Sequence, residues 1–356
     1  MLAITGMGLI SAVGRDVASS CASLRAGISR ARGLLSYQVL NADDQEPMPV
    51  RACPVHGFTE GFQHLGLWVR LASAALSDMI QFSGLPGSGA GSWYGTALAV
   101  VAPLLNQHRF DGAELLSDSL FESYILPAAR NSGLATSRDL AEWIPAGHAG
   151  AAIAIERASA QITRGVPRVI VLAADSYCDP LTLGWLHSLG RLKTPDNPVG
   201  CVPGEAAACL LLESVESARR RGAHIFAVIG GCATASEPDH WMSGKRSQGR
   251  GLAAAIENAL SQASGTPFSG DLLSDMNGEE WRAYELGSAR VRLQSQFDPS
   301  RILYPAVSFG ETGAASGIAA ICAAARSLER RYASGSAALV ASSSDNESRG
   351  ATYLTC

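Results

Sequence analysis

The chain alternates between short continuous runs of apolar residues and longer stretches in which apolar residues recur at helical spacing. Continuous runs are typical of strands buried on both faces, and the periodic stretches are typical of helices. The predicted strands lie at residues 2–5, 92–101, 168–174, 207–213, 225–231, 271–275 and 337–341. The predicted helices lie at residues 69–80, 112–125, 149–163, 213–221, 251–263 and 313–330. This alternation predicts an α/β protein with parallel-type sheets that are covered by helices on both faces.

A glycine-led segment occurs twice, and each copy opens an alanine-rich helical stretch. The copies lie at residues 147–152 (GHAGAA) and 310–315 (GETGAA). Each helix is followed by an apolar run that ends in small polar residues. A repeat of about half the chain is too long for a solenoid, whose period is about 20–50 residues. We therefore predict two similar halves, residues 1–221 and 222–356, packed into a five-layered α/β/α/β/α body.

The composition fits two packed halves with a large interior. The chain has 356 residues, of which 47% are hydrophobic and 17% are charged. This length exceeds what one hydrophobic core usually supports, and the 37 glycines predict close contacts between helices and sheets. No apolar run is long enough to span a membrane, and the start of the chain lacks the pattern of a signal peptide. We therefore expect a cytoplasmic protein.

Charge and cysteine content argue against several kinds of site. The net charge is −4, the only lysines are Lys193 and Lys245, and no basic cluster occurs, so we expect no nucleic-acid partner. The eight cysteines form no C-x-x-C pair and no zinc-type spacing. We expect them to be buried, reduced thiols, and we predict neither a metal site nor a cofactor.

Several motifs resemble those of the β-ketoacyl-acyl carrier protein synthases, a family with the thiolase fold. The motifs are TGMG at residues 5–8, GEAAA at 204–208, LLLE at 210–213, ESARRRGA at 216–223 and the two glycine-led helices. They follow one another in the family's order over nearly the whole chain, and residues 203–223 are the most specific part. The resemblance implies a thiolase fold and a dimer.

The family's chemistry depends on a cysteine and two histidines. The cysteine thiolate takes the acyl chain, and the histidines stabilise the charge that develops when a malonyl thioester is decarboxylated. The resemblance places the family's cysteine at His148 and one of its histidines at Glu311. The second histidine falls within residues 275–279, where Asn277 takes its place. His240 is the last histidine of the chain, so a Cys-His-His site cannot be built at these positions in any register.

The C-terminal loop departs from the family as well. Residues 342–350 (SSSDNESRG) stand where the family has a loop rich in phenylalanine and glycine that helps to form the oxyanion hole. This change is independent of the missing cysteine. Together the two changes predict a homologue that performs no condensation on its own.

Three roles are open to His148 on sequence alone. An imidazole at the start of a buried helix can act as a base, and Glu311 nearby would complete a His–carboxylate pair. The side chain can instead satisfy a local hydrogen bond and fill the space left by the cysteine. It can also take part in ligand binding or in an interface.

Other polar residues invite a chemical role and are expected to have a structural one. The resemblance makes Glu205 a buried packing and hydrogen-bonding residue. The acidic segment 275–285 is expected to form a solvated loop, with a subunit contact or a divalent-metal site as alternatives. Cys178 has no neighbouring cation to activate its thiolate, so we do not predict a replacement nucleophile paired with His187.

These observations predict a catalytically silent, ketosynthase-like pseudoenzyme of fatty acid or polyketide biosynthesis. It would be a non-condensing partner subunit, similar to the chain-length factors that shape an acyl tunnel with an active ketosynthase. The expected partners are that ketosynthase in a heterodimer, or a second copy in a homodimer, and an acyl carrier protein. One alternative is an acyltransferase, decarboxylase or hydrolase of acyl thioesters that uses His148 and Glu311. Another is a scaffold or adaptor in an unrelated protein assembly.

Overall fold

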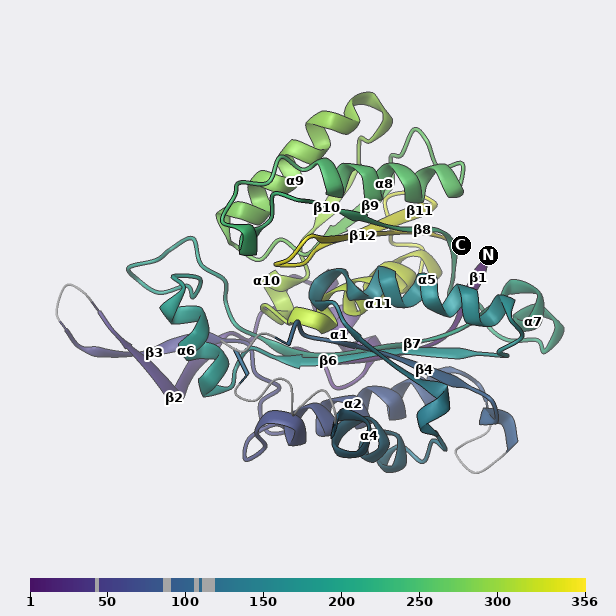
Figure 1. Ribbon diagram of the computed structural model, residues 1–356, viewed down its shortest axis with the longest axis horizontal. Coiled ribbons are helices and arrows are strands. Elements are labelled where there is room, and N and C mark those ends of the chain that lie inside the picture. Colours follow the sequence, from purple (N-terminus) through teal and green to yellow (C-terminus); the bar gives the residue numbers. More distant parts are fainter. Residues whose placement is uncertain (42–44, 86–90, 106–108, 111–118) are drawn as a thin grey trace.

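The computed structural model describes residues 1–41, 45–85, 91–105, 109–110 and 119–356. In this part of the chain, ten strands are hydrogen-bonded in the order β10-β9-β11-β12-β8-β1-β7-β6-β4-β5. The strands of the first half are β1 (Leu2–Ser11), β4 (Ala97–Ala102), β5 (Ala141–Pro145), β6 (Val169–Ser176) and β7 (Glu205–Ser214). The strands of the second half are β8 (Ala227–Ser236), β9 (Asp271–Ser274), β10 (Arg301–Leu303), β11 (Ala337–Ser343) and β12 (Ser348–Thr355). A separate pair, β2 (Arg32–Leu40) and β3 (Pro47–Ala52), forms a hairpin that projects from the body (Figure 1).

Both halves of the sheet have the same strand order and the same strand directions. β5, β4 and β6 run parallel, and β7 and β1 follow antiparallel. β10, β9 and β11 likewise run parallel, and β12 and β8 follow antiparallel. β1 and β8 pair over residues 2–4 and so join the halves. The predicted duplication is confirmed, but the prediction of parallel-type sheets is wrong near the junction, where for example a short turn between β11 and β12 permits only antiparallel pairing.

Helices occupy three layers around the two halves of the sheet (Figure 1). α5 (Gly150–Thr163) and α11 (Ser316–Glu329) lie between the halves, and α8 (Arg250–Gln262) and α9 (Glu280–Leu293) cover the second half. α2 (His64–Phe82) and α4 (Leu126–Asn131) cover the first half. The shorter helices are α1 (Val17–Arg25), α6 (Pro180–Ser188), α7 (Val215–Arg220) and α10 (Ala306–Phe309). Single helical turns lie at η1 (Gly91–Trp93), η2 (Phe121–Ile125), η3 (Arg138–Leu140), η4 (Gly147–Ala149), η5 (Trp241–Ser243), η6 (Gln294–Gln296) and η7 (Gly313–Ala315). This is the predicted five-layered thiolase body.

Small residues allow the central helices to pack closely. A Cβ added at Gly150 would lie 2.3 Å from Val101 Cγ1, and one added at Gly317 would lie 2.8 Å from the Cβ of Ala151. Atoms cannot approach so closely, so glycine at these positions lets α5 and α11 sit against each other and against the sheet. The alanine-rich repeats therefore form the central helix layer, and both halves of the sheet pack against it.

Several elements were not predicted, because their apolar patterns are brief or irregular. They are the β2–β3 hairpin, the strands β5, β10 and β12, and the helices α1, α6, α9 and α10. α6 is started by Asp179, whose carboxylate accepts hydrogen bonds from the N–H groups of Leu181 and Thr182. It carries apolar residues on buried and exposed faces alike, as Leu183 and Leu181 illustrate, so it has no helical period to detect.

Two predicted features lie beyond what the structure decides. Residues 112–118 of the predicted helix 112–125 fall outside the described residues. The predicted division after residue 221 falls between α7 and β8, and as a domain boundary it stays a prediction. Among the described residues, no helix is both long enough and apolar enough to cross a membrane.

Candidate functional site

The three positions where the resemblance expects catalytic residues meet at the centre of the molecule. His148 lies in η4 directly before α5, Glu311 lies between α10 and η7, and Asn277 lies between β9 and α9. His148 Nε2 is 2.7 Å from Glu311 Oε1, and the Asn277 amide donates to Glu311 Oε2. The His148 and Glu311 residues are each only 3% exposed. The structure thus brings the three predicted residues together, and their chemical use stays a prediction.

Backbone hydrogen bonds hold Glu311 in place. Its N–H donates to Val202 O at 2.7 Å, and its carbonyl accepts from Gly204 N at 2.9 Å. A Cβ at Gly204 would lie 2.2 Å from Phe309 O, so only glycine permits this approach. The GEAAA motif that begins at Gly204 therefore supports the segment that carries Glu311.

Arg282, on α9, lies beside this pair. Its Nη1 is 2.7 Å from Asp275 Oδ2 and donates to Ser343 O at 2.6 Å. Its Nη2 is 3.1 Å from His148 Nε2. The guanidinium is almost fully buried, at 2% residue exposure, so these neighbours replace its water.

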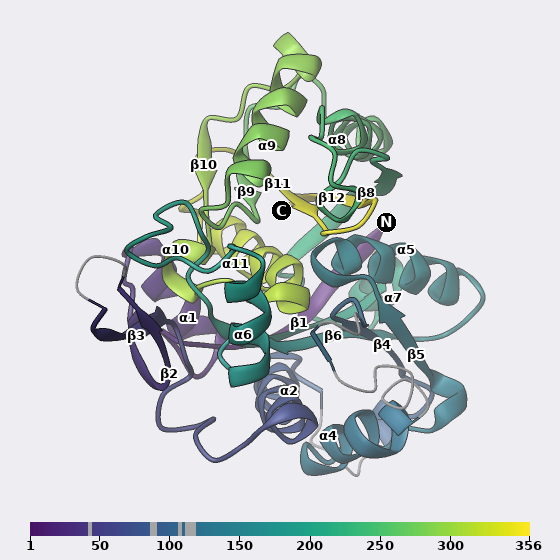
Figure 2. The ribbon, with the colours of Figure 1, turned by 60° about the vertical axis from the view of Figure 1, so that its left-hand side comes forward.

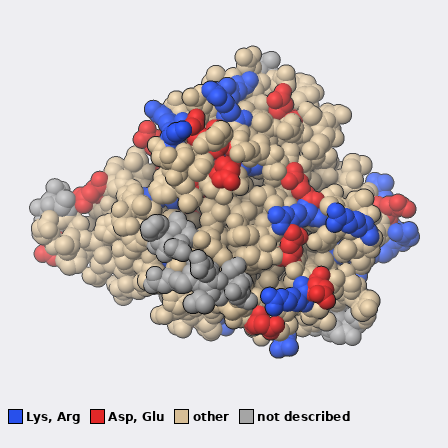
Figure 3. Space-filling view, viewed as in Figure 1, with Lys and Arg blue, Asp and Glu red and all other residues tan. Residues whose placement is uncertain are grey.

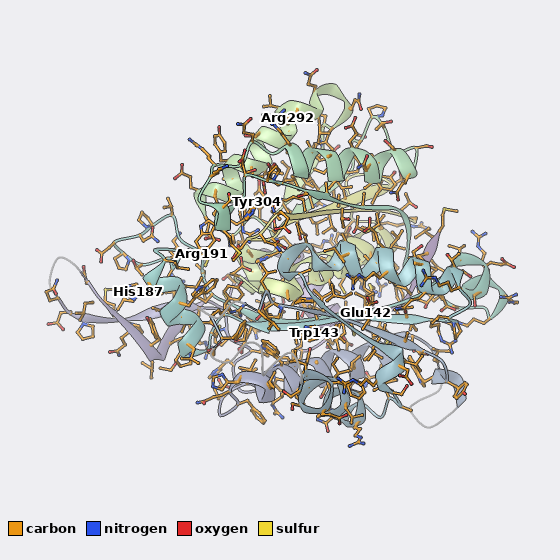
Figure 4. The ribbon with its side chains drawn as sticks, in the orientation of Figure 1. Glu142, Trp143, His187, Arg191, Arg292 and Tyr304 are labelled. Carbon is orange, nitrogen blue, oxygen red and sulfur yellow. The ribbon has the colours of Figure 1, made fainter. Side chains whose placement is uncertain are left out.

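Arg191, labelled in Figure 4, extends the group of charges from the turn after α6. Its Nε is 2.6 Å from Glu279 Oε1, and its Nη1 is 2.6 Å from Asp345 Oδ2. Glu279 also accepts from Asn277 Nδ2 at 2.8 Å, which connects these ion pairs to Glu311. We call the whole group the central cluster: His148, Arg191, Asp275, Asn277, Glu279, Arg282, Glu311 and Asp345.

The proton of the His148–Glu311 contact is carried by His148. Burial raises the pKa of Glu311, but His148 and then Arg282 and Asn277 outweigh burial and hold this pKa well below its usual range. Since the carboxylate has no proton to give, Nε2–H of His148 donates to it. A guanidinium can only donate and Nε2 already carries a proton, so the approach of Arg282 Nη2 to the same nitrogen is a close contact and not a hydrogen bond.

Little space remains beside His148. The cavity that it lines with Arg109, Asp175 and Trp241 has a volume of about 20 Å³, room for about one water molecule. The adjacent hydroxyl of Ser344 is already in use, because it accepts from Ala149 N at 2.9 Å and donates to Ala146 O at 2.6 Å. An acyl thioester therefore has no room next to His148 in this conformation.

A second buried ion pair also lines this cavity. Arg109 Nη2 is 2.6 Å from Asp175 Oδ1, and Asp175 Oδ2 accepts from Ala314 N at 3.0 Å. Burial raises the pKa of Asp175, and Arg109 offsets only part of that rise. Because Asp175 is the penultimate residue of β6 and Ala314 lies in η7, this carboxylate fastens the sheet of the first half to the second glycine-led repeat.

The acidic segment 275–285 is not a solvated loop, and that prediction is wrong. Residues from Glu280 onward form α9, and the buried Glu279 and Glu285 pair with Arg191 and Arg349. The physical reason is that arginines from distant segments neutralise these carboxylates, which then tolerate burial. Within the described ranges, no group of three or more His, Cys, Asp or Glu side chains is placed to hold a metal ion.

The remaining candidates have structural surroundings. Among the described residues, the contact of His187 is with Tyr37, whose hydroxyl lies 3.3 Å from Nδ1. Burial raises the pKa of the Cys178 thiol well above its usual value, so Cys178 is not a thiolate at neutral pH. Glu205 is buried and accepts three hydrogen bonds, which agrees with the packing and hydrogen-bonding role expected of it.

Arg109, Arg191 and Asp345 were not predicted as partners of the site. They lie outside the glycine-led repeats, and Asp345 was noticed only as part of the C-terminal segment 342–350. One signal was present in the composition, since only two of the 28 basic residues are lysines. Arginine is preferred in buried ion pairs because its guanidinium is weakly hydrated and binds carboxylates through two N–H groups.

The comparison with curated proteins finds relatives over part of the chain, and no family model matches it. The granaticin polyketide putative beta-ketoacyl synthase 1 of Streptomyces violaceoruber is 37% identical over 108 residues, which is 27% of this chain. The aligned region spans only 25% of that relative's length.

Solved structures are similar over the whole chain. The structure of the ishigamide ketosynthase/chain length factor has a TM-score of 0.75 and 20% identity, and the match covers 99% of this chain and 98% of that one. A type II polyketide synthase acyl-carrier protein in complex with its ketosynthase gives a TM-score of 0.77 at 18% identity, with coverage of 100% and 98%. The structural matches establish the fold, and the curated relative adds sequence similarity over part of the chain. The chain therefore has the fold of these ketosynthase structures, and part of it is similar in sequence to a polyketide beta-ketoacyl synthase.

Proposed function

We propose that this chain is a non-condensing partner subunit that pairs with a cysteine-bearing ketosynthase, in the manner of a chain-length factor. The observation that carries the proposal is the contact between His148 and Glu311. These residues stand where the resemblance expects the nucleophilic cysteine and one histidine. Neither an imidazole nor a carboxylate held in this way can form the acyl thioester on which condensation depends. The similar structure of the ishigamide ketosynthase/chain length factor supports the proposed setting.

The central cluster supports a structural use of the former catalytic positions. Arg191 comes from the first half of the chain, whereas its partners Glu279 and Asp345 come from the second half. A subunit that carries no acyl group at these positions can accommodate paired charged side chains there. The pairs then fix the loops around the site, because removing one partner would leave an uncompensated buried charge.

The test is purification of the tagged full-length chain from its native host, followed by mass spectrometry of its stoichiometric partners. We expect a ketosynthase with an intact Cys-His-His set, and the purified complex should condense malonyl and acyl thioesters of an acyl carrier protein. The chain alone should not. Replacing the partner's cysteine by alanine should abolish condensation, whereas Glu311→Gln in this chain should leave the rate of the assembled complex unchanged.

The His148–Glu311 pair also favours a second candidate, a hydrolase or acyltransferase of acyl thioesters in which His148 activates water. The cavity beside His148 admits a water molecule but no acyl group. Hydrolysis of acyl thioesters by the chain alone that disappears in both His148→Ala and Glu311→Gln would replace the first proposal with this one. Recovery of partners unrelated to acyl carriers, without hydrolysis, would instead favour a scaffold.

A further inference from the structure

A groove lies on the side of the molecule from which the β2–β3 hairpin projects. It is bounded by the hairpin, residues 193–195, residues 276–278 and residues 304–307. Figure 2 shows α10 beside β2 and β3, and Figure 4 shows Tyr304 on this side of the body. The groove has a volume of about 650 Å³, within the range of about 300–1,000 Å³ that small-molecule sites occupy. The groove is thus large enough for a small molecule, whereas the cavity at His148 holds about one water molecule.

The walls of the groove are mostly apolar. Val39 and Met48 are paired across the hairpin and line one wall, and Met276 and Val307 line another. Val39 is held in place because it also packs in a small core with residues of α6. Val307 is 64% exposed, so the groove keeps apolar surface in contact with water that an apolar ligand would cover. On the face shown in Figure 3, the hairpin carries few charged side chains.

The charged side chains that line the groove are cationic. They are Arg51 on β3 and Lys193, one of the two lysines of the chain, and no described carboxylate lines the groove. Both cations are exposed, and within the described ranges neither forms an ion pair with a carboxylate. An anionic group placed in the groove would therefore meet two positive charges and no lining carboxylate.

We propose that this groove binds an elongated apolar anion, a hydrocarbon chain that ends in a carboxylate or a phosphate. The apolar walls take the chain, and Arg51 and Lys193 take the anionic end. Asn277 also lines the groove and is hydrogen-bonded to Glu311, so a ligand here touches the edge of the central cluster. The site is separate from His148 and does not depend on the proposed pairing with a ketosynthase.

The test is calorimetric titration of the full chain with four probes of equal chain length, each below its aggregation concentration. The probes are decanoate, decyl phosphate, decanol and decyltrimethylammonium. Both anions should bind, the better one identifying the anionic end, and the alcohol and the cation should bind at least tenfold more weakly. Lys193→Gln and Arg51→Gln should each weaken anion binding by about fivefold, as expected for a partly exposed charge contact.

Two further variants keep the test decisive. Lys245→Gln removes the other lysine, which is exposed and lies outside the groove, and should leave anion binding unchanged. Ala31→Trp places a large side chain in the groove and should abolish binding while the melting temperature is retained. Failure of the wild-type chain to bind either anion would overturn the proposal. Equal binding by wild type, Lys193→Gln and Ala31→Trp would also overturn it, whatever partners the co-purification finds.

Discussion

His148 Nε2 and Glu311 Oε1 lie 2.7 Å apart, although 163 residues separate them along the chain. The two residues occupy the same place in the two glycine-led repeats, residues 147–152 and 310–315. Each half of the molecule thus supplies one member of the pair, and neither half can form it alone. The contact therefore joins the two halves at the positions that the resemblance equates with catalytic residues of the family.

Breaking this pair should destabilise the fold in a non-additive way. His148→Ala leaves the Glu311 carboxylate buried with fewer partners, and we expect it to lower the free energy of unfolding by about 3 kcal/mol. Glu311→Ala should have a similar effect. In the double variant the loss should be smaller than the sum of the two by about 1–3 kcal/mol, which urea unfolding of the four proteins would measure.

The exposed pair Arg157–Glu142 provides a matched comparison. Their side chains are 46% and 35% exposed, so the same cycle at this pair should give a coupling of no more than about 1 kcal/mol. A coupling at His148 and Glu311 as small as that of the surface pair would mean that burial adds nothing to the contact.

Acid should weaken the protein partly through Asp345. Burial raises the pKa of Asp345, but Arg191 and then Arg282 outweigh burial and lower the pKa to about 2. A carboxyl group with a lowered folded pKa stabilises the fold above its unfolded pKa of about 4, and this stabilisation is lost as the pH falls toward 2. The contribution at neutral pH is about 2 kcal/mol. Unfolding free energies measured from pH 5 to pH 2.5 should therefore fall less steeply in Asp345→Asn than in the wild type.

Asp298→Asn serves as the control for this measurement, because Asp298 is exposed and lies outside the central cluster. Its acid profile should match that of the wild type. If Asp345→Asn also kept the full wild-type decrease between pH 4 and pH 2.5, the ion pair with Arg191 would not hold the folded pKa down.

The repeats could be found from the sequence because they are local. The segments that contain His148 and Glu311 repeat the same small residues, and the resemblance to the ketosynthase family placed the two side chains at one site. Arg191 could not be found in this way, since its carboxylate partners lie 88 and 154 residues further along the chain. Which charged residues far apart in the sequence come into contact depends on the fold.

The C-terminal loop shows a second limit of the sequence. The sequence showed that this loop differs from the loop of the family it resembles. It did not show the role of the arginine within the loop. Arg349 is completely buried, lies 2.9 Å from Glu285 through Nε, and donates to the carbonyls of Ser344 and Asn346. An arginine in a serine-rich stretch predicts an exposed turn, and it is the carboxylate of α9 that draws this one inward.

Chemical labelling should separate one reactive cysteine from the buried ones. Cys356 is exposed, whereas burial raises the pKa of Cys21 to about 12, that of Cys53 to about 11 and that of Cys232 to about 12. The thiolate is the species that reacts with iodoacetamide, so at pH 7.5 the native protein should be labelled rapidly at Cys356 alone. Mass spectrometry of the labelled peptides would measure this.

Cys356→Ser should remove the rapid labelling, and unfolding in urea should make all the remaining cysteines reactive. The informative contrary result is rapid native labelling of Cys178. It would show a thiolate just after β6 and would make Cys178 a candidate nucleophile after all.

The central helix layer depends on glycine at position 317. A methyl group there would lie 2.8 Å from Ala151 Cβ and 3.0 Å from His148 O, so α11 or α5 must move to accept Gly317→Ala. We expect this variant to lower the free energy of unfolding by about 1–3 kcal/mol, as overpacking in a tight core does.

Gly287→Ala in α9 is the matched control, because a Cβ at Gly287 meets no atom within 4 Å. Alanine favours the helix there, so the control should stabilise the protein by about 0.5–1 kcal/mol. If both variants were stabilising in thermal and urea unfolding, α5 and α11 would have room between them, and the backbone of His148 would not be held by the packing of the second half.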